Sequence, residues 1–319
     1  MALARGVALG VAGLWVCGAV TTAAATMRIS QDSAAGQVKV LYHDRPLLVY
    51  QYTAHPYKPY VKALFSLQGD NVLLDAPPDH LHHHGLMFAV KVNGTNFWEE
   101  ARNPGVEKPL GPPKVTTQAG EGAPAQAELT QTIDWVAQAH RDRADTWPVA
   151  LLREQRRLVL GVHPEAKEVA LLWQSRFTVG PAAPEVRLTG ADYHGLGLRL
   201  PEAWNHVARH ENSEGLPYSA EQKWDVLPAR WSKVSCKLGG REVTVVMCNT
   251  PRNPGPSRFF SMLNPFTYLS ATQSWSRKPQ VYRAGQSFTL QYLVLVYPEA
   301  PSRRALEQRY ARWVKETAP

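Results

Sequence analysis

The chain has 319 residues, of which 44% are hydrophobic and 10 are tryptophan, so it can build one large β domain or two smaller ones. Its formal net charge is +8, but the basic residues are scattered and no nucleic-acid-binding motif occurs. These features argue against a nucleic acid as partner. They are compatible with a carbohydrate or another small-molecule ligand.

The N-terminus has the parts of a secretory signal peptide. Arg5 supplies a positive charge, Val7 to Val20 form an apolar core, and Ala23 to Ala25 form a small-residue cleavage site. The apolar core is shorter than the ~20 residues that a membrane helix needs. We therefore expect residues 1–25 to be removed, leaving 26–319 as a periplasmic or secreted domain without a membrane span.

Runs of β-branched and aromatic residues, bounded by Gly, Pro, Asn or Asp, predict an all-β, antiparallel structure. In the stretch from Gln126 to Ala137 the pattern has period two, with Leu129, Ile133 and Trp135 on one face. Two segments, 101–125 and 204–224, are predicted as long surface loops. The predicted strands are 38–42, 46–52, 60–67, 85–92, 127–138, 150–160, 169–179, 186–189, 196–200, 234–238, 241–245 and 287–297.

Two features near the C-terminus complete the predicted fold. A tight turn at Gly239 and Gly240 places Cys236 opposite Val243, so Cys248 lies ~16 Å along the strand and cannot bridge to Cys236. We predict two free, buried thiols. From Ser302 to Lys315 the apolar residues follow a helical period, which predicts a single helix that packs on an edge of the sandwich.

Four histidines lie within five positions, at His80, His82, His83 and His84. If the segment is extended, His80, His82 and His84 point to one side and could hold a divalent metal such as zinc. Alternatively, His80, His82 and His83 act as acid/base or substrate-binding groups without a metal. A third interpretation is a polar loop whose histidines bond only to the backbone.

A second candidate group precedes a glycine-punctuated strand. Asp192, Tyr193 and His194 bring an acid, a phenol and an imidazole together, and Arg199 follows. We predict a catalytic role for His194 and substrate-binding roles for Asp192, Tyr193 and Arg199. Glu99 is a further substrate-binding candidate beside Trp98, which we expect to be a core residue.

Several segments resemble one bacterial family, once labelled "methane oxygenase PmoA" and later classed as a domain of unknown function. The Pro-Pro-Asp-His-Leu-His-His motif at residues 77–83 is the most specific of them, although His84 stands where the family has an arginine. The resemblance implies a large antiparallel β-sandwich, similar to the galactose-mutarotase-like supersandwich, with a sugar site built from His, Tyr, Glu and Arg. The other segments that carry it are 58–60, 92–98, 195–199, 250–254 and 285–313.

Together these features predict an exported carbohydrate-active enzyme of hydrolase or lyase type with a histidine-cluster site. Two alternatives stay open. The chain is a non-catalytic sugar-binding sandwich, or it is a metal-dependent oxygenase, as the old family label suggests.

Overall fold

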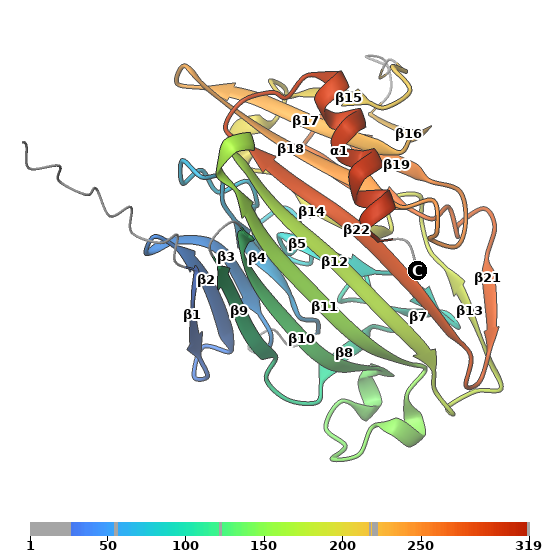
Figure 1. Cartoon of the computed structure of the whole chain (residues 1–319). Coiled ribbons are helices and arrows are strands. Elements are labelled where there is room, and N and C mark those ends of the chain that lie inside the picture. The colour runs from blue at the N-terminus through green and yellow to red at the C-terminus, as the bar shows by residue number, and fades with distance from the viewer. Residues whose placement is uncertain (1–26, 54–56, 121–122, 217, 219–222, 318–319) are drawn as a thin grey trace, which may run out of the picture.

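The structure is a computed structural model that describes residues 27–53, 57–120, 123–216, 218 and 223–317. In these residues the chain forms antiparallel β-sheets and a C-terminal helix, which confirms the predicted fold class (Figure 1). The predicted signal peptide, residues 1–25, lies outside the described residues. No helix in the described part of the chain is long and apolar enough to cross a membrane.

The first sheet has nine strands among the described residues, and every neighbouring pair is antiparallel. It joins the N-terminal strands to strands from the second half of the chain through the pairing of β5 with β14. Its strands, in spatial order, are β1 (Met27–Asp32), β2 (Gln37–Tyr42), β3 (Arg45–Gln51), β4 (Tyr60–Leu64), β5 (Leu86–Ala89), β14 (Gly195–Arg199), β20 (Tyr268–Thr272), β19 (Arg258–Met262) and β16 (Trp224–Pro228).

The second sheet contains the longest strands, and a small third sheet lies beside it. The second sheet runs β15 (Arg209–Asn212), β17 (Trp231–Leu238), β18 (Arg241–Asn249), β22 (Ser287–Tyr297), β12 (Glu168–Val179), β11 (Leu152–His163), β10 (Ala123–Ala137) and β8 (Gly105–Pro109), with β9 (Lys114–Gly120) also paired to β10. The third sheet runs β21 (Gln280–Arg283), β13 (Glu185–Thr189), β6 (Lys91–Val92) and β7 (Thr95–Asn96). Short 3₁₀ helices span Gln138–His140, Trp147–Val149, Pro164–Ala166 and Glu202–Trp204.

The main core lies between the two large sheets. Phe88 of the first sheet packs against Trp135, Phe177 and Tyr292 of the second, with ring centroids 5.7–6.4 Å apart. Leu129, Ile133 and Trp135 are all buried, so the predicted period-two face of this strand is confirmed. The alternation arises because successive side chains of a strand point to opposite faces.

The predicted helix is confirmed as α1 (Arg303–Glu316), and the Ser302 hydroxyl accepts a hydrogen bond from the Ala305 N–H at its start. It packs on the outer face of the second sheet rather than on an edge, so that part of the prediction is wrong. The physical reason lies in β22, whose Leu293, Leu295 and Tyr297 face away from the main core and form a second apolar cluster. The buried residues Leu306, Tyr310 and Trp313 of α1 belong to that cluster and cover it. Figure 1 shows the helix lying against this sheet.

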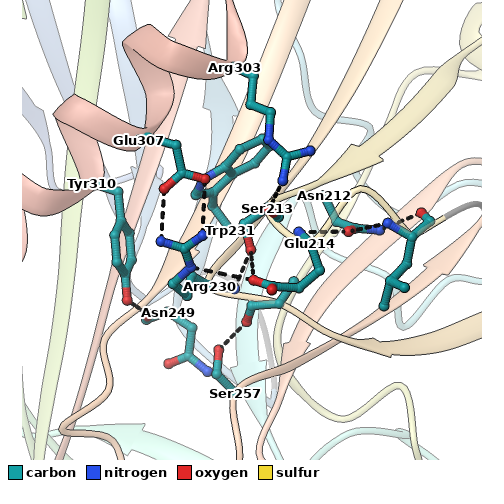
Figure 2. Close-up of polar contacts among 12 residues, drawn as sticks. Asn212, Ser213, Glu214, Arg230, Trp231, Asn249, Ser257, Arg303, Glu307 and Tyr310 are labelled. Atoms are coloured by element: carbon teal, nitrogen blue, oxygen red, sulfur yellow. Dashed lines mark hydrogen bonds and ion pairs between the residues drawn. The ribbon is translucent and has the colours of Figure 1, made fainter.

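Polar contacts fix the helix on this face (Figure 2). Arg230 donates two hydrogen bonds to the Glu307 carboxylate, at 2.8 and 3.1 Å. The Tyr310 hydroxyl donates to the Asn249 carbonyl at 3.1 Å. The helix is therefore attached both to the end of β18 and to the residue that precedes β17.

The cysteine hairpin is confirmed, with Cys236 paired to Val243 and Cys248 paired to Trp231. Both thiols are free and buried. The two predicted loops are less accurate. Segment 101–125 contains β8 and β9, and segment 204–224 contains β15, because pairing with β10 and β17 orders stretches whose Pro, Gly and polar residues suggested loops.

An ionic cluster is buried in the main core. Glu154 and Arg156 have the same strand parity as the core residues Leu152 and Leu158, so they point inward. Arg156 lies 2.7 Å from Glu154 and 3.0 Å from Glu107. Burial raises the pKa of Glu107 to about 8, and the attraction of Arg156 offsets only part of this effect.

The raised pKa of Glu107 predicts a pH-dependent stability. The carboxyl group is protonated in the folded chain up to about pH 8 but ionises near 4.5 in the unfolded chain. The contribution of the Glu107 carboxyl group to the free energy of unfolding is therefore fully present below pH 4.5. It is lost as the pH rises through 8. Glu107→Gln should remove this fall, so the variant should gain stability over the wild type between pH 5 and 8. Urea unfolding at several pH values measures it, and a difference that does not change with pH contradicts the assignment.

Candidate functional site

The floor of the site is a row of side chains across four strands of the first sheet. Arg199 of β14 pairs with Tyr268 of β20, Tyr268 with Met262 of β19, and Met262 with Trp224 of β16. Residues paired in register point to the same face of a sheet. Leu196 pairs in register with Phe88, which packs against the second sheet, so Leu196 and Leu198 face the main core. Successive side chains of a strand alternate, so the row that begins at Arg199 faces away from the second sheet.

A pocket of about 630 Å³ opens above this row. Its volume lies within the range of ~300–1,000 Å³ found for small-molecule sites. The lining combines aromatic rings with a few charged or polar groups. It consists of His80, His82, His83, Trp98, Glu99, Asp192, Tyr193, Trp224, Phe260, Met262, Phe266, Tyr268, Ser276 and Arg277.

The histidine segment forms a turn, so the extended conformation under which His80, His82 and His84 would share one side does not occur. The His83 N–H donates to the His80 carbonyl, and this turn gathers His80, His82 and His83. His80 stacks on His83 with centroids 4.6 Å apart, and His82 meets His83 edge-on at 4.6 Å. Gly85 ends the turn at φ +37°, where an added Cβ would lie 2.3 Å from the Val61 carbonyl oxygen.

His84 points away from the other three histidines. Its Nδ1 lies 3.0 Å from Asp75 and its Nε2 lies 3.0 Å from Glu100. The structure therefore does not bring together the predicted metal set of His80, His82 and His84. In the part of the chain that the structure describes, no group of three or more His, Cys, Asp or Glu side chains is arranged to hold a metal ion.

Asp79 and Arg199 hold His80 from below. The Asp79 Oδ2 atom lies 3.0 Å from His80 Nδ1 and accepts a hydrogen bond from Arg199 Nη2 at 2.9 Å. Arg199 is buried and lies 3.6 Å above the centre of the Phe266 ring. Arg199, predicted to bind substrate, thus lies beneath the histidines and positions them. When His80 Nδ1 carries the proton toward Asp79, its Nε2 is a proton acceptor.

The three clustered histidines differ in exposure, and burial lowers the pKa of two of them. Burial lowers the pKa of His83 to about 2, so its ring is neutral. Arg199 Nη1 lies 3.3 Å from His83 Nδ1, which makes this nitrogen the acceptor. Burial and the nearby Lys58 charge lower the pKa of His82. The His80 side chain is 35% exposed and its Nδ1 contacts Asp79, so an oriented ring is accessible to a ligand and to solvent.

His194 lies behind the pocket. It stacks on Trp98 with centroids 5.0 Å apart and does not line the cavity. Burial lowers its pKa to about 3, and its Nδ1 has no hydrogen-bond partner among the described residues. His194, predicted to be catalytic, therefore supports the Trp98 ring and does not contact the cavity. Trp98 itself is fully buried, as predicted, and its ring still borders the cavity.

Glu99, Asp192 and Tyr193 do meet at the pocket. The Tyr193 hydroxyl lies 3.5 Å from Glu99 Oε1, and burial together with this carboxylate raises the pKa of Tyr193. Asp192 accepts hydrogen bonds from Arg277 at 2.8 Å and from Ser276 at 2.6 Å. The hydrogen bond from Arg277 lowers the pKa of Asp192, which stays ionised.

Several lining residues were missed by the sequence analysis, namely Trp224, Phe260, Met262, Phe266, Tyr268, Ser276 and Arg277. Segments 258–262 and 268–272 are rich in β-forming residues, so the signal for two more strands was present. The strand 268–272 reaches the site by pairing with β14, which lies far earlier in the chain, and the strand 258–262 reaches it by pairing with 268–272 in turn. Local patterns carry no information on such a pairing.

Gly197 makes room for two aromatic rings of the pocket. An added Cβ would lie 1.8 Å from the Tyr268 hydroxyl oxygen and 3.1 Å from the nearest Trp98 atom. We expect Gly197→Ala to destabilise the fold by about 1–3 kcal/mol through overpacking and to weaken ligand binding. Calorimetric unfolding measures this effect. Gly161→Ala is the matched control, because its Cβ would make only ordinary contacts at 3.7 Å or more, and an equal loss in both variants contradicts the prediction.

Comparison with known proteins identifies a family but no activity. A model described as a family of unknown function (DUF6807) matches residues 37–311, and its description makes no mention of a methane oxygenase. No curated protein matches the chain.

Solved structures of similar shape include a GH36 alpha-galactosidase from Geobacillus stearothermophilus (11% identity, TM-score 0.49) and a putative aldose 1-epimerase from Klebsiella pneumoniae (11% identity, TM-score 0.39). The matches cover 86% and 88% of this chain, respectively. They cover 82% of the epimerase but only 41% of the galactosidase, so this chain spans less than half of the latter protein.

Proposed function

Because the chain belongs to this family of unknown function (DUF6807), we propose its function from the pocket itself: a carbohydrate-active enzyme in which His80 transfers a proton to or from the bound sugar. The observation that carries the proposal is the partly exposed His80 imidazole, held by Asp79 in the lining of an aromatic pocket.

The pocket lining suits a sugar. Tyr193 offers a partly exposed flat apolar surface for the C–H face of a pyranose ring, and the largely buried rings of Trp98, Phe260, Phe266 and Tyr268 complete the apolar lining. The few polar groups among them can fix orientation by binding hydroxyl groups, as in small-molecule sites generally. Asp192 is ionised and can accept such hydrogen bonds.

Proton transfer requires a base and an acid near the same bond. His80 can accept a proton at Nε2 because Asp79 fixes the proton on Nδ1. Tyr193 can donate one, because its raised pKa keeps the phenol protonated at neutral pH. In an elimination, His80 takes the proton from C5, the carbon next to the carboxylate. The electron pair left on C5 forms a C4=C5 double bond, the C4–O glycosidic bond breaks, and the Tyr193 proton passes to the leaving oxygen.

These groups favour a lyase over a hydrolase. Glycoside hydrolysis commonly uses two carboxyl groups, one of them protonated. Among the described lining residues the carboxyl groups are Glu99 and Asp192, and Asp192 is held ionised by Arg277. A histidine base with a tyrosine acid instead suits proton removal next to a carboxylate, as in the elimination reaction of a uronic-acid sugar.

A turnover assay with named polysaccharides tests the proposal. Polygalacturonate, alginate, xylan and galactomannan are each incubated with the purified chain. Unsaturated ends are followed by absorbance, and new reducing ends are measured separately. We expect unsaturated products from a uronic-acid polymer. Reducing ends without unsaturation would indicate the hydrolase type.

The non-catalytic alternative predicts a different result with the same sugars, namely binding without turnover. Saturable binding of these sugars by calorimetry, without any product, would establish a binding module and overturn the enzymatic proposal.

Metal analysis of the purified protein, repeated for His82→Ala, addresses the metal-dependent alternative. Metal at one equivalent per chain, lost in this variant, would support it.

A further inference from the structure

We propose that the pocket binds two consecutive sugar residues, the first beside the histidines and the second stacked on Trp224. The inference rests on the proposed function and adds the length and direction of the substrate to it. It makes Trp224 a specificity-determining residue at the end of the pocket opposite to His80.

Trp224 exposes an unusual amount of aromatic surface. Its side chain lines the pocket and the residue is 49% exposed. Among the large hydrophobic residues that are exposed in the described chain, it is the aromatic one, whereas the others are leucines and valines. Large aromatic side chains are mostly buried, so an indole left open beside a cavity indicates a surface that a ligand covers.

The indole is held in place before any ligand arrives. Trp224 stacks on Phe260 with centroids 6.3 Å apart and an angle of 26° between the rings. Its backbone pairs in register with Met262, on the edge strand β16. A ring fixed in this way loses little conformational freedom on binding, so it is a preorganised platform for a flat apolar face.

The geometry of the sheet sets the distance between the two ends of the pocket. Three strand-to-strand steps separate Arg199, below the histidines, from Trp224. At ~4.8 Å per step this separation is ~14 Å. One pyranose ring is smaller than this span. A sugar ring at His80 therefore leaves Trp224 uncovered, and the neighbouring ring of the same chain can reach it.

Calorimetric binding of the full chain to sugars of increasing length tests the inference. The probes are the mono-, di- and trisaccharides of the four polysaccharides in the activity panel. For at least one series we expect the disaccharide to bind about tenfold or more tightly than the monosaccharide. Trp224→Ala should remove this gain and leave the affinity for the monosaccharide unchanged, whereas Trp224→Phe should keep most of it.

Trp147→Ala is the matched control, because Trp147 is a partly buried tryptophan that does not line the pocket. Equal melting temperatures of the three variants and the wild type exclude a folding defect. Equal affinity for mono- and disaccharides, or a gain that survives in Trp224→Ala, overturns this inference and leaves the proposed function standing. If no sugar of any length binds, the proposed function fails, and the inference fails with it.

Discussion

Replacing His80 by alanine should lower turnover about 1,000-fold, the middle of the range of ~10²–10⁴ that a general acid or base contributes. The side chain is partly exposed, so its removal leaves no buried cavity and the fold should persist. The loss should appear in kcat much more than in KM, because the aromatic surfaces that bind the sugar remain. Steady-state kinetics on the polysaccharide that is turned over, together with a melting temperature, measures both effects.

Two further variants distinguish proton transfer from a structural role of His80. Asp79→Asn keeps the shape of the side chain but removes the charge that orients the His80 ring, so it should cause a smaller loss and change the pH profile. His140→Ala alters a histidine that does not line the pocket and should leave kcat unchanged. A His80→Ala variant with wild-type kcat would rule out proton transfer by this residue.

The predictable part of the fold was the part encoded in local periodicity. Alternation along β10 placed Leu129, Ile133 and Trp135 in the core, and the helical stripe around Tyr310 located α1. The face that α1 covers was not predictable, since it depends on the outward residues of β22 meeting those of β17 and β18. Sequence spacing on one strand does not reveal which neighbouring strands extend its apolar surface.

The candidate site shows the same division. The sequence singled out the histidine segment and Asp192–Tyr193, and the structure places members of both groups around one pocket. The sequence did not show that His84 points away from His80, His82 and His83, because a turn rather than a strand sets the directions of these side chains. Nor could it find Trp224, which reaches the pocket only through three consecutive strand pairings.

Replacing Arg156 by methionine should destabilise the fold by about 3–5 kcal/mol, as expected when one partner of a buried ion pair is removed. Arg156 donates to the buried Glu154 carboxylate at 2.7 and 2.8 Å and packs over the Trp173 ring. Without Arg156, the Glu154 charge would stay buried with only neutral donors, from Trp135 and Ser175. Urea unfolding at pH 7 measures the loss.

The neighbouring residue of the same strand provides the matched control. Arg157 pairs with Glu128 at 2.7 Å on the outer face, where both side chains are partly exposed. Arg157→Met should therefore cost only about 0.2–1 kcal/mol. The double variant Arg156→Met, Glu154→Gln should regain most of the stability, because it removes the uncompensated charge and keeps an acceptor for Trp135. If the double variant is as unstable as Arg156→Met, lost packing rather than charge is the cause.

Arg156→Met should also affect the pocket. Arg156 Nη1 donates to the Pro59 carbonyl at 2.7 Å, and the preceding residue, Lys58, donates to the Trp98 carbonyl at 2.8 Å. Loss of the first bond frees the segment that fixes Trp98 beside the histidines. Arg156→Met should therefore weaken sugar binding even at temperatures where the chain is fully folded, whereas Arg157→Met should not. The ionic cluster inside the sandwich thus supports one wall of the site on its outer face.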